Sequence, residues 1–214
     1  MAKPRKPQTQ RNSIAVIGEG ITEQYYLQSI KSSIEINIEP KLPKHSTGTK
    51  YLEDKIKECV DAGYPHVLCL IDMDNKEVGK EKIAYEKLKA KYHNKTKEKK
   101  AKGLSSTIVF YENERCLELW FLYHFEYTTR QFNNYQELEN QLQKHISNYE
   151  KTAQYFKNAR GLHRLIINDF DGHFDIAKAN SKNSIESKER DYRNYTYSEM
   201  KDFFDYLEYN YPRK

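Results

Sequence analysis

This 214-residue sequence lacks long apolar runs, paired cysteines and a secretory leader. No stretch approaches the roughly 18 apolar residues that a membrane span needs, and the basic start is not followed by the apolar segment of a signal peptide. Its three cysteines, Cys59, Cys69 and Cys116, include no C-x-x-C pair, so neither a disulfide framework nor a zinc ribbon is indicated. These absences predict a cytoplasmic protein with no membrane partner.

Several sequence motifs of known enzyme classes are also missing. Residues 48–50 (G-T-K) are only a fragment of the phosphate-binding pattern G-x-x-x-x-G-K-[ST], so ATP hydrolysis by a P-loop is not supported. Neither the H-E-x-x-H pattern of zinc proteases nor the G-x-S-x-G pattern of serine hydrolases occurs.

Aromatic and charged residues are plentiful. Hydrophobic residues make up only 37% of the chain, but 18 tyrosines and 9 phenylalanines can supply the buried surface of a globular core. The net charge of +5 is unevenly spread, because residues 76–102 hold eleven lysines against four glutamates and residues 1–12 carry four further positive charges. Two basic segments on an otherwise acidic body indicate contact with a polyanion such as nucleic acid, although each is also compatible with a solvated surface.

Strand and helix patterns alternate through the first 125 residues. Short apolar or alternating runs predict strands, and periods of three to four residues predict the helices between them. The expected strands cover 13–17, 34–38, 66–71 and 106–111, and the expected helices cover 50–62, 79–93 and 114–125 together with one that begins at Thr22. This alternation favours a parallel-rich sheet flanked by helices, an α/β fold.

The chain is expected to divide into three parts. Residues 1–12 form a flexible basic tail, 13–127 form the α/β domain, and 128–214 form a helical C-terminal extension that completes the same globule. Within the extension, residues 134–148 and 197–209 are expected to be helical. The polar, Ser/Asn-rich segment 178–195 is expected to be an exposed loop or lid.

Acidic residues follow two of the predicted strands. Glu19 comes after the first strand, between two glycines, and Asp72 and Asp74 come after the third apolar strand. Ligands of parallel sheets sit at the carboxyl ends of the strands, and side chains two residues apart on an extended segment share a face. Clustered carboxylates repel one another unless a cation neutralises them. The three residues therefore predict a site for Mg²⁺ or Mn²⁺.

Three further residues are candidates for catalysis. Glu118 lies in a nearly all-apolar helix, where a carboxylate needs a cation, a hydrogen-bond network or a cleft. Glu23 lies in the first turn of a predicted helix, where an acid also suits the helix dipole. His124 lies near the end of the Glu118 helix and is also compatible with a packed or capping histidine. The nucleic-acid backbone is expected to contact the lysine-rich segment at Lys87, Lys91, Lys95, Lys99 and Lys100.

Four local patterns resemble the RloB-like family, prokaryotic proteins often associated with restriction-modification and anti-phage loci. Residues 18–26 (G-E-G-I-T-E-Q-Y-Y) resemble its G-E-x-x-T-E-x-x-Y, and residues 72–74 its D-x-D. Residues 116–125 are similar to its C-F-E-L-W-L-L-H-F-like helix, and residues 149–151 to its Y-x-K element. Where the family usually has a small residue and a proline before the cysteine, this chain has Glu114 and Arg115.

The resemblance implies a Toprim-like fold, with Glu19 as the general acid/base and Asp72 and Asp74 as Mg²⁺ ligands. The leading hypothesis is a metal-dependent nuclease that hydrolyses DNA or RNA in anti-phage defence, in which Glu118 would hold a second metal or orient a water. One alternative is a non-catalytic metal- or nucleotide-binding partner that regulates an ATPase. Another is a receiver-like signalling domain with Asp72 as the phosphoacceptor, although an acid pair directly after the first strand is missing. Homo-oligomer formation stays open.

Overall fold

A five-stranded sheet forms the centre of the computed structural model, which describes residues 13–33, 38–41, 48–74, 76–159, 161–191 and 195–211. The strand order is β2-β1-β3-β5-β4. The strands are β1 (Ile14–Ile17), β2 (Ile38–Lys41), β3 (His66–Asp72), β4 (Lys95–Lys99) and β5 (Leu104–Asn113). The basic tail expected at 1–12 and the first residues of the strand expected at 34–38 lie outside the described residues.

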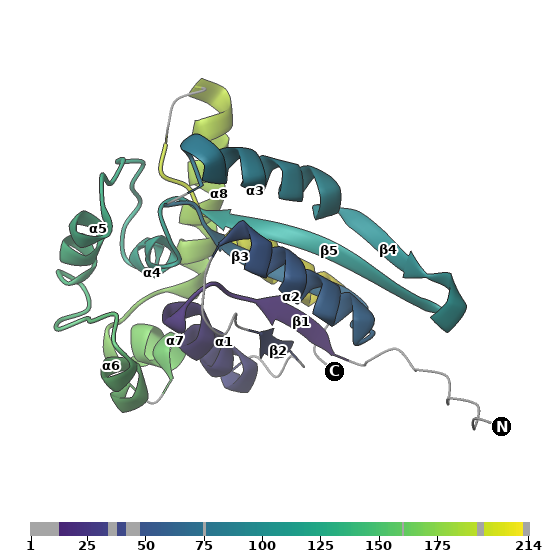
Figure 1. Ribbon diagram of the computed structural model, residues 1–214. Helices are drawn as coiled ribbons and strands as arrows, with labels where there is room; N and C mark the ends of the chain where they lie inside the picture. Colours follow the sequence, from purple (N-terminus) through teal and green to yellow (C-terminus); the bar gives the residue numbers. More distant parts are fainter. Residues whose placement is uncertain are drawn as a thin grey trace.

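Four of the strands run parallel, as the alternating sequence pattern predicts. β1 pairs with β2 and β3, β3 pairs with β5 in parallel, and only β4 is antiparallel to its neighbour. The carboxyl ends of β1, β3 and β5 therefore meet at one edge of the sheet (Figure 1). A receiver-like sheet of the flavodoxin type has the strand order 2-1-3-4-5. Here β5 lies next to β3, and the antiparallel strand β4 forms the edge of the sheet beyond β5, so the receiver-like alternative does not fit.

Helices cover both faces of the sheet. α2 (Thr49–Asp61) and α3 (Gly79–Tyr92) lie on one face, where Leu52, Ile56 and Leu88 pack against the strand residues that point to their side. Successive strand residues point to opposite faces, so the neighbouring residues of β1, β3 and β5 belong to the second core. Two separate apolar cores thus hold the sheet edge in a fixed position.

The second core is larger and rich in aromatic side chains. α1 (Ile21–Ser33), α4 (Glu118–Tyr123) and the C-terminal helices build it, with Trp120, Phe121 and Tyr149 fully buried. The C-terminal helices are α5 (Tyr135–Leu142), α6 (Ala153–Asn158), α7 (Leu162–Arg164), α8 (Phe174–Asp191) and α9 (Met200–Asn210), with a π-helical turn at Leu165–Asp169. The α/β fold with a helical C-terminal extension is therefore confirmed.

The loop or lid expected at 178–195 is wrong, because α8 occupies most of that segment. Its polar sequence conceals a buried stripe of small residues, Ala177, Ser181 and Ser184, which are all fully buried. The Ser181 hydroxyl donates to the Ser198 carbonyl, and the Ser184 hydroxyl donates to the Ser181 carbonyl. Small hydroxyl side chains let this helix pack closely, although serine is more typical of turns and helix caps than of helix interiors.

Other elements also differ from the sequence-based expectation, among them α5, which ends at Leu142 rather than at 148, and the short helices α6 and α7, which were not expected. α4 begins only at Glu118, four residues later than expected, and the all-polar strand β4 was not expected at all. None of the described helices is both long and apolar enough to cross a membrane.

Candidate functional site

An acidic cavity of about 350 Å³ opens at the edge of the sheet where β1 and β3 end. The residues that line it are Glu19, Gly20, Gly48, Asp72, Asp74, Lys76, Glu81 and Lys151. All three predicted metal ligands are among them. The parallel register of β1 and β3 explains this, because it brings the segments that follow both strands to the same edge.

Glu19 is paired with a lysine that the sequence did not single out. Its carboxylate accepts a hydrogen bond from the Lys76 ammonium at 2.7 Å, and both side chains are more than nine-tenths buried. Lys76 also donates to the Asp72 carbonyl at 2.8 Å, which fixes it beside the cavity. Burial raises the pKa of Glu19 to about 7, although the Lys76 ammonium offsets part of this rise. Glu19 can therefore exchange a proton near neutral pH.

Asp72 and Asp74 both face the cavity, with the buried Met73 between them pointing away. Asp72 accepts a hydrogen bond from the Leu117 backbone amide at 3.0 Å, just before α4. Burial raises the pKa of Asp72 well above its usual range, and the charges of nearby Glu23, Glu118 and Glu19 add to the effect. A nearby cation would stabilise the ionised form of such a buried carboxylate.

Glu23 and Glu118 form a deeper acidic layer beneath the cavity. The Glu23 carboxylate accepts from the Gly20 amide at 2.7 Å, as in a helix capping box, so the residue has a structural role at the start of α1. Burial and the charge of Glu118 raise the pKa of Glu23. Thr22, where the predicted helix begins, lies inside α1, and its hydroxyl donates a hydrogen bond to Glu118 at 2.8 Å.

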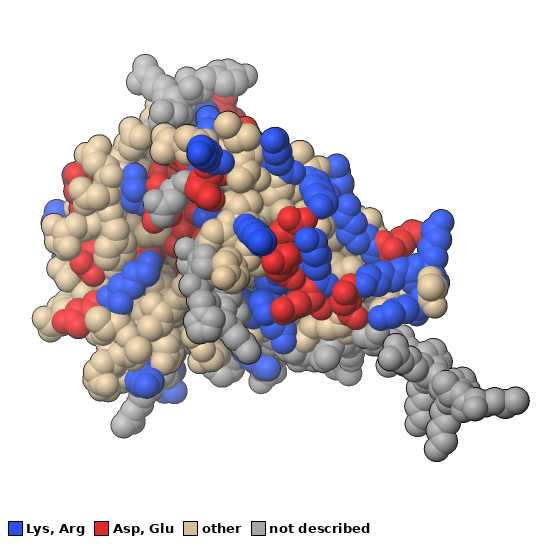
Figure 2. Space-filling model, viewed as in Figure 1, with Lys and Arg blue, Asp and Glu red and all other residues tan. Residues whose placement is uncertain are grey.

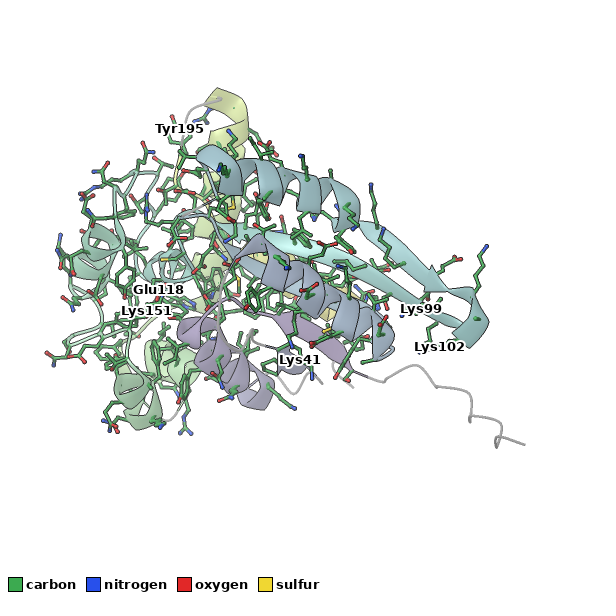
Figure 3. All side chains as sticks on the ribbon, in the orientation of Figure 1. Lys41, Lys99, Lys102, Glu118, Lys151 and Tyr195 are labelled. Atoms are coloured by element: carbon green, nitrogen blue, oxygen red, sulfur yellow. The ribbon has the colours of Figure 1, made fainter. Side chains whose placement is uncertain are left out.

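Lys151 compensates the charge of Glu118. Its ammonium lies 3.0 Å from the Glu118 carboxylate, and the two side chains lie side by side in Figure 3 although 33 positions separate them in the sequence. Burial alone would raise the pKa of Glu118, but Lys151 and the hydrogen bonds from Cys116 and Thr22 lower it overall. Burial likewise opposes the charge of Lys151, yet Glu118 raises its pKa. Lys151 also lines the cavity. The only sequence signal that pointed to this lysine was the short Y-x-K element at residues 149–151.

Three buried carboxylate oxygens in and beneath this cavity have no hydrogen-bond partner among the described residues: Oε1 of Glu19, Oε1 of Glu23 and Oε2 of Glu118. Orphaned oxygens of this kind, beside Asp72 and Asp74, have the hard-ligand chemistry that Mg²⁺ or Mn²⁺ takes. In the part of the chain that the structure describes, however, no three His, Cys, Asp or Glu side chains are arranged as a finished metal-binding group. The donor set therefore suits a divalent ion in chemistry, with Lys76 and Lys151 already providing positive charge.

His124 is not brought to this cavity. Its ring is fully buried among Trp120, His163 and Phe174, and neither ring nitrogen has a hydrogen-bond partner in the described part of the chain. Burial lowers its pKa to about 3, with smaller contributions from His163 and His173. A histidine in this setting stays neutral and packs in the aromatic core.

The lysines expected to bind nucleic acid differ in their surroundings. Lys87 and Lys91 line a groove that faces α2, and Lys91 is ion-paired with Glu53 at 2.7 Å. Lys99 is ion-paired with Asp61, also of α2. Figure 2 shows basic and acidic side chains intermixed on one face of the molecule. Lys95 donates to the Ala90 carbonyl.

The remaining predicted lysine, Lys100, lies with Lys99 at the tip of the β4–β5 hairpin (Figure 3). The ten residues of β5 separate this tip from the acidic edge, a distance of about 30 Å. The tip and the acidic cavity are thus at opposite ends of the sheet.

A family model described as RloB-like protein matches residues 14–207, nearly the whole chain. The chain belongs to the RloB-like protein family. The match includes the acidic cavity, both lysines that face it and the C-terminal helices that place Lys151. Comparison of this RloB-like chain with curated proteins and with solved structures gave no match.

Proposed function

We propose that this RloB-like chain is a metal-dependent nuclease that hydrolyses phosphodiester bonds of DNA or RNA in anti-phage defence, on a Toprim-like α/β fold. The observation that carries the proposal is the set of three orphaned carboxylate oxygens beside one acidic cavity, at the sheet edge where parallel sheets bind ligands. Buried carboxylates without partners are costly, and a divalent cation would satisfy them.

Glu19, Asp72 and Asp74 would hold Mg²⁺ or Mn²⁺. When bound, the ion would polarise a phosphate oxygen and stabilise the charge that develops on the leaving oxygen. Glu19, with a pKa near neutrality, would move a proton to or from the reacting oxygens. Lys76 keeps Glu19 oriented toward the cavity, and Lys151 holds Glu118 ionised beneath it.

The test compares the wild-type protein with an Asp72→Asn/Asp74→Asn variant on plasmid DNA and on total tRNA, each with Mg²⁺, Mn²⁺ or EDTA. Cleavage should require the metal and should disappear in the variant, because both ligand charges are lost. The side-chain oxygen introduced by Asp72→Asn can still accept from the Leu117 amide, so the variant should fold normally. Asp54→Asn, at an exposed position on α2, is the matched control. Metal-dependent cleavage by the double variant would refute the site.

A non-catalytic role as a metal- or nucleotide-binding partner that regulates an ATPase is the second candidate. It is favoured by one observation: Glu19 and Glu118 each already have a lysine within 3.0 Å, so their charges are compensated without a metal. Under this hypothesis, Mg²⁺ would raise the melting temperature of the wild-type protein but not of the Asp72→Asn/Asp74→Asn variant. No nucleic acid would be cleaved, and the protein would bind an ATPase. Cleavage of either nucleic acid would exclude it.

A further inference from the structure

A second cavity lies directly beside the acidic one. It has a volume of about 530 Å³ and lies between α3, the end of β5 and α8. Its lining includes four lysines, two tyrosines and three glutamates, namely Lys76, Lys82, Lys89, Lys188, Tyr85, Tyr197, Glu77, Glu86 and Glu112. The function proposed above assigns no role to this cavity.

The two cavities are neighbours because of the segment that follows β3. Asp72 and Asp74 line the acidic cavity, whereas Met73 between them lines the second one. This is the alternation expected of an extended segment. Lys76 lines both cavities, so a ligand in one lies next to a ligand in the other.

The floor of the second cavity is a saturated carboxylate. Glu112, at the end of β5, accepts hydrogen bonds from Tyr85 at 2.6 Å, from Tyr197 at 2.8 Å and from the Lys89 ammonium. Burial opposes its charge, but Lys89 and the tyrosine hydroxyls lower its pKa overall. Glu112 and Lys89 therefore compensate each other, and neither leaves a net charge for a ligand.

Two lysines on the walls have no such partner. No carboxylate of a described residue lies within ion-pair distance of Lys82 or Lys188, and the Lys188 ammonium lies over the Tyr197 ring, 3.2 Å from its centroid. Burial lowers the pKa of Lys188, so an anion that pairs with it would be stabilised by a partly desolvated charge. The ring holds the ammonium in place at the cavity wall.

One acid of the cavity lining, Glu77, is hydrogen-bonded to a neighbouring glutamate. Its partner is Glu114, whose pKa burial and the charge of Glu77 raise to about 8. Lys76 is paired with Glu19 and Lys89 with Glu112, so Lys82 and Lys188 are the lysines of this lining that have no ion-pair partner among the described residues. A phosphodiester carries one negative charge, and the ammonium groups of Lys82 and Lys188 could pair with it.

The structure thus separates the lysines of α3 by face. Those that face α2 meet its acids, as Lys91 meets Glu53, whereas Lys82 and Lys89 face the second cavity with Lys188. We propose that the cavity between α3 and α8 binds a backbone phosphate of the nucleic acid next to the phosphodiester held in the acidic cavity. This inference rests on the proposed function for the identity of the neighbouring ligand, and it places nucleic-acid contact on the face of α3 opposite to Lys87 and Lys91.

Binding is measured in EDTA by fluorescence anisotropy, so that it does not depend on cleavage. The probes are a labelled DNA duplex and a labelled single-stranded RNA of matched length, titrated over a series of salt concentrations. Lys82→Gln/Lys188→Gln should weaken binding to the preferred probe roughly tenfold or more at low salt, and should reduce the salt slope by about 1 to 2. Lys87→Gln/Lys91→Gln, which removes the same charge from the other face of α3, should change both quantities little.

The single variant Lys188→Arg keeps the positive charge at this position and leaves Lys82 in place, so it should retain the wild-type salt slope. Wild-type affinity and slope in Lys82→Gln/Lys188→Gln would overturn the proposal, as would an equal loss in Lys87→Gln/Lys91→Gln or the absence of binding to both probes by the wild-type protein. Cleavage by the wild-type protein with no effect of Lys82→Gln/Lys188→Gln on binding would refute the cavity and leave the nuclease. Loss of binding in Lys82→Gln/Lys188→Gln, without any cleavage by the wild-type protein, would support the cavity as a binding site and refute the nuclease.

Discussion

Replacing Lys151 by methionine should destabilise the protein by leaving the Glu118 carboxylate buried without a cation. Glu118 is fully buried, and Thr22 and Tyr149 would remain as its hydrogen-bond donors, at 2.8 and 3.2 Å. Removing one partner of a buried ion pair costs about 3–5 kcal/mol. The Lys151 side chain keeps 29% of its exposure, so solvent screens the pair in part and we expect a loss of about 2–4 kcal/mol.

The loss should depend on pH with a defined sign. Without Lys151, burial raises the pKa of Glu118 in the folded state above the ordinary value of 4.5. The folded state then binds more protons than the unfolded chain above that pH, so the free energy of unfolding falls as pH rises through the folded pKa. The deficit of Lys151→Met relative to wild type should therefore be small near pH 5 and larger near pH 8.

The assay is urea unfolding at several pH values for wild type, Lys151→Met, Glu118→Gln and the double variant. In Glu118→Gln/Lys151→Met the buried carboxylate is gone and the side-chain amide that replaces it can still accept from Thr22, so stability should return to within about 1 kcal/mol of wild type. A Lys151→Met protein as stable as wild type at every pH, or a double variant no more stable than Lys151→Met, would refute the argument.

Two further predictions concern the aromatic core. Burial lowers the pKa of His124 to about 3 and that of His163 to about 4. Below pH 6.5 the unfolded chain therefore binds protons that the folded protein does not, and each histidine should lower the free energy of unfolding by about 1.4 kcal/mol per pH unit. Urea unfolding of a His124→Phe/His163→Phe variant should show a weaker acid loss, and an unchanged pH dependence would contradict this. A Cβ at Gly172 would lie 2.7 Å from a methyl carbon of Ile166, so Gly172→Ala should lose about 1–3 kcal/mol. Gly103→Ala, at φ +64 with open space around it, should lose only about 1 kcal/mol, and equal losses in the two variants would show that the Ile166 contact does not matter.

Sequence patterns predicted the sheet because its strands are buried and apolar. The runs that became β1 and β3 are bounded by glycine or acidic residues, and the alternation with helices fixed their parallel direction. β4 escaped prediction because its sequence, K-T-K-E-K, has no apolar residue, and its backbone pairing with β5 alone defines it as a strand. Tertiary pairing of this kind leaves no local signal.

The candidate site divides in the same way. Glu19, Asp72 and Asp74 could be placed together from the ends of their strands, because strand direction determines where the following residues go. Lys151 reaches the cavity from a segment after α5, and its position depends on how the C-terminal helices pack over α4. The same holds for Lys188 on α8, in a segment whose buried small residues resemble those of a loop.

The strands β3 and β5 continue side by side beyond the sheet itself. The Met73 amide donates to the Asn113 carbonyl and the Asp74 amide donates to the Arg115 carbonyl, both at 3.0 Å. These main-chain hydrogen bonds fix the backbone that carries the two aspartates, whose side chains are short. Lys76, by contrast, reaches Glu19 through a long side chain with several rotatable bonds. Under the proposed function, a divalent cation would displace the Lys76 ammonium from Glu19, while the main chain that carries the two aspartates stays in place.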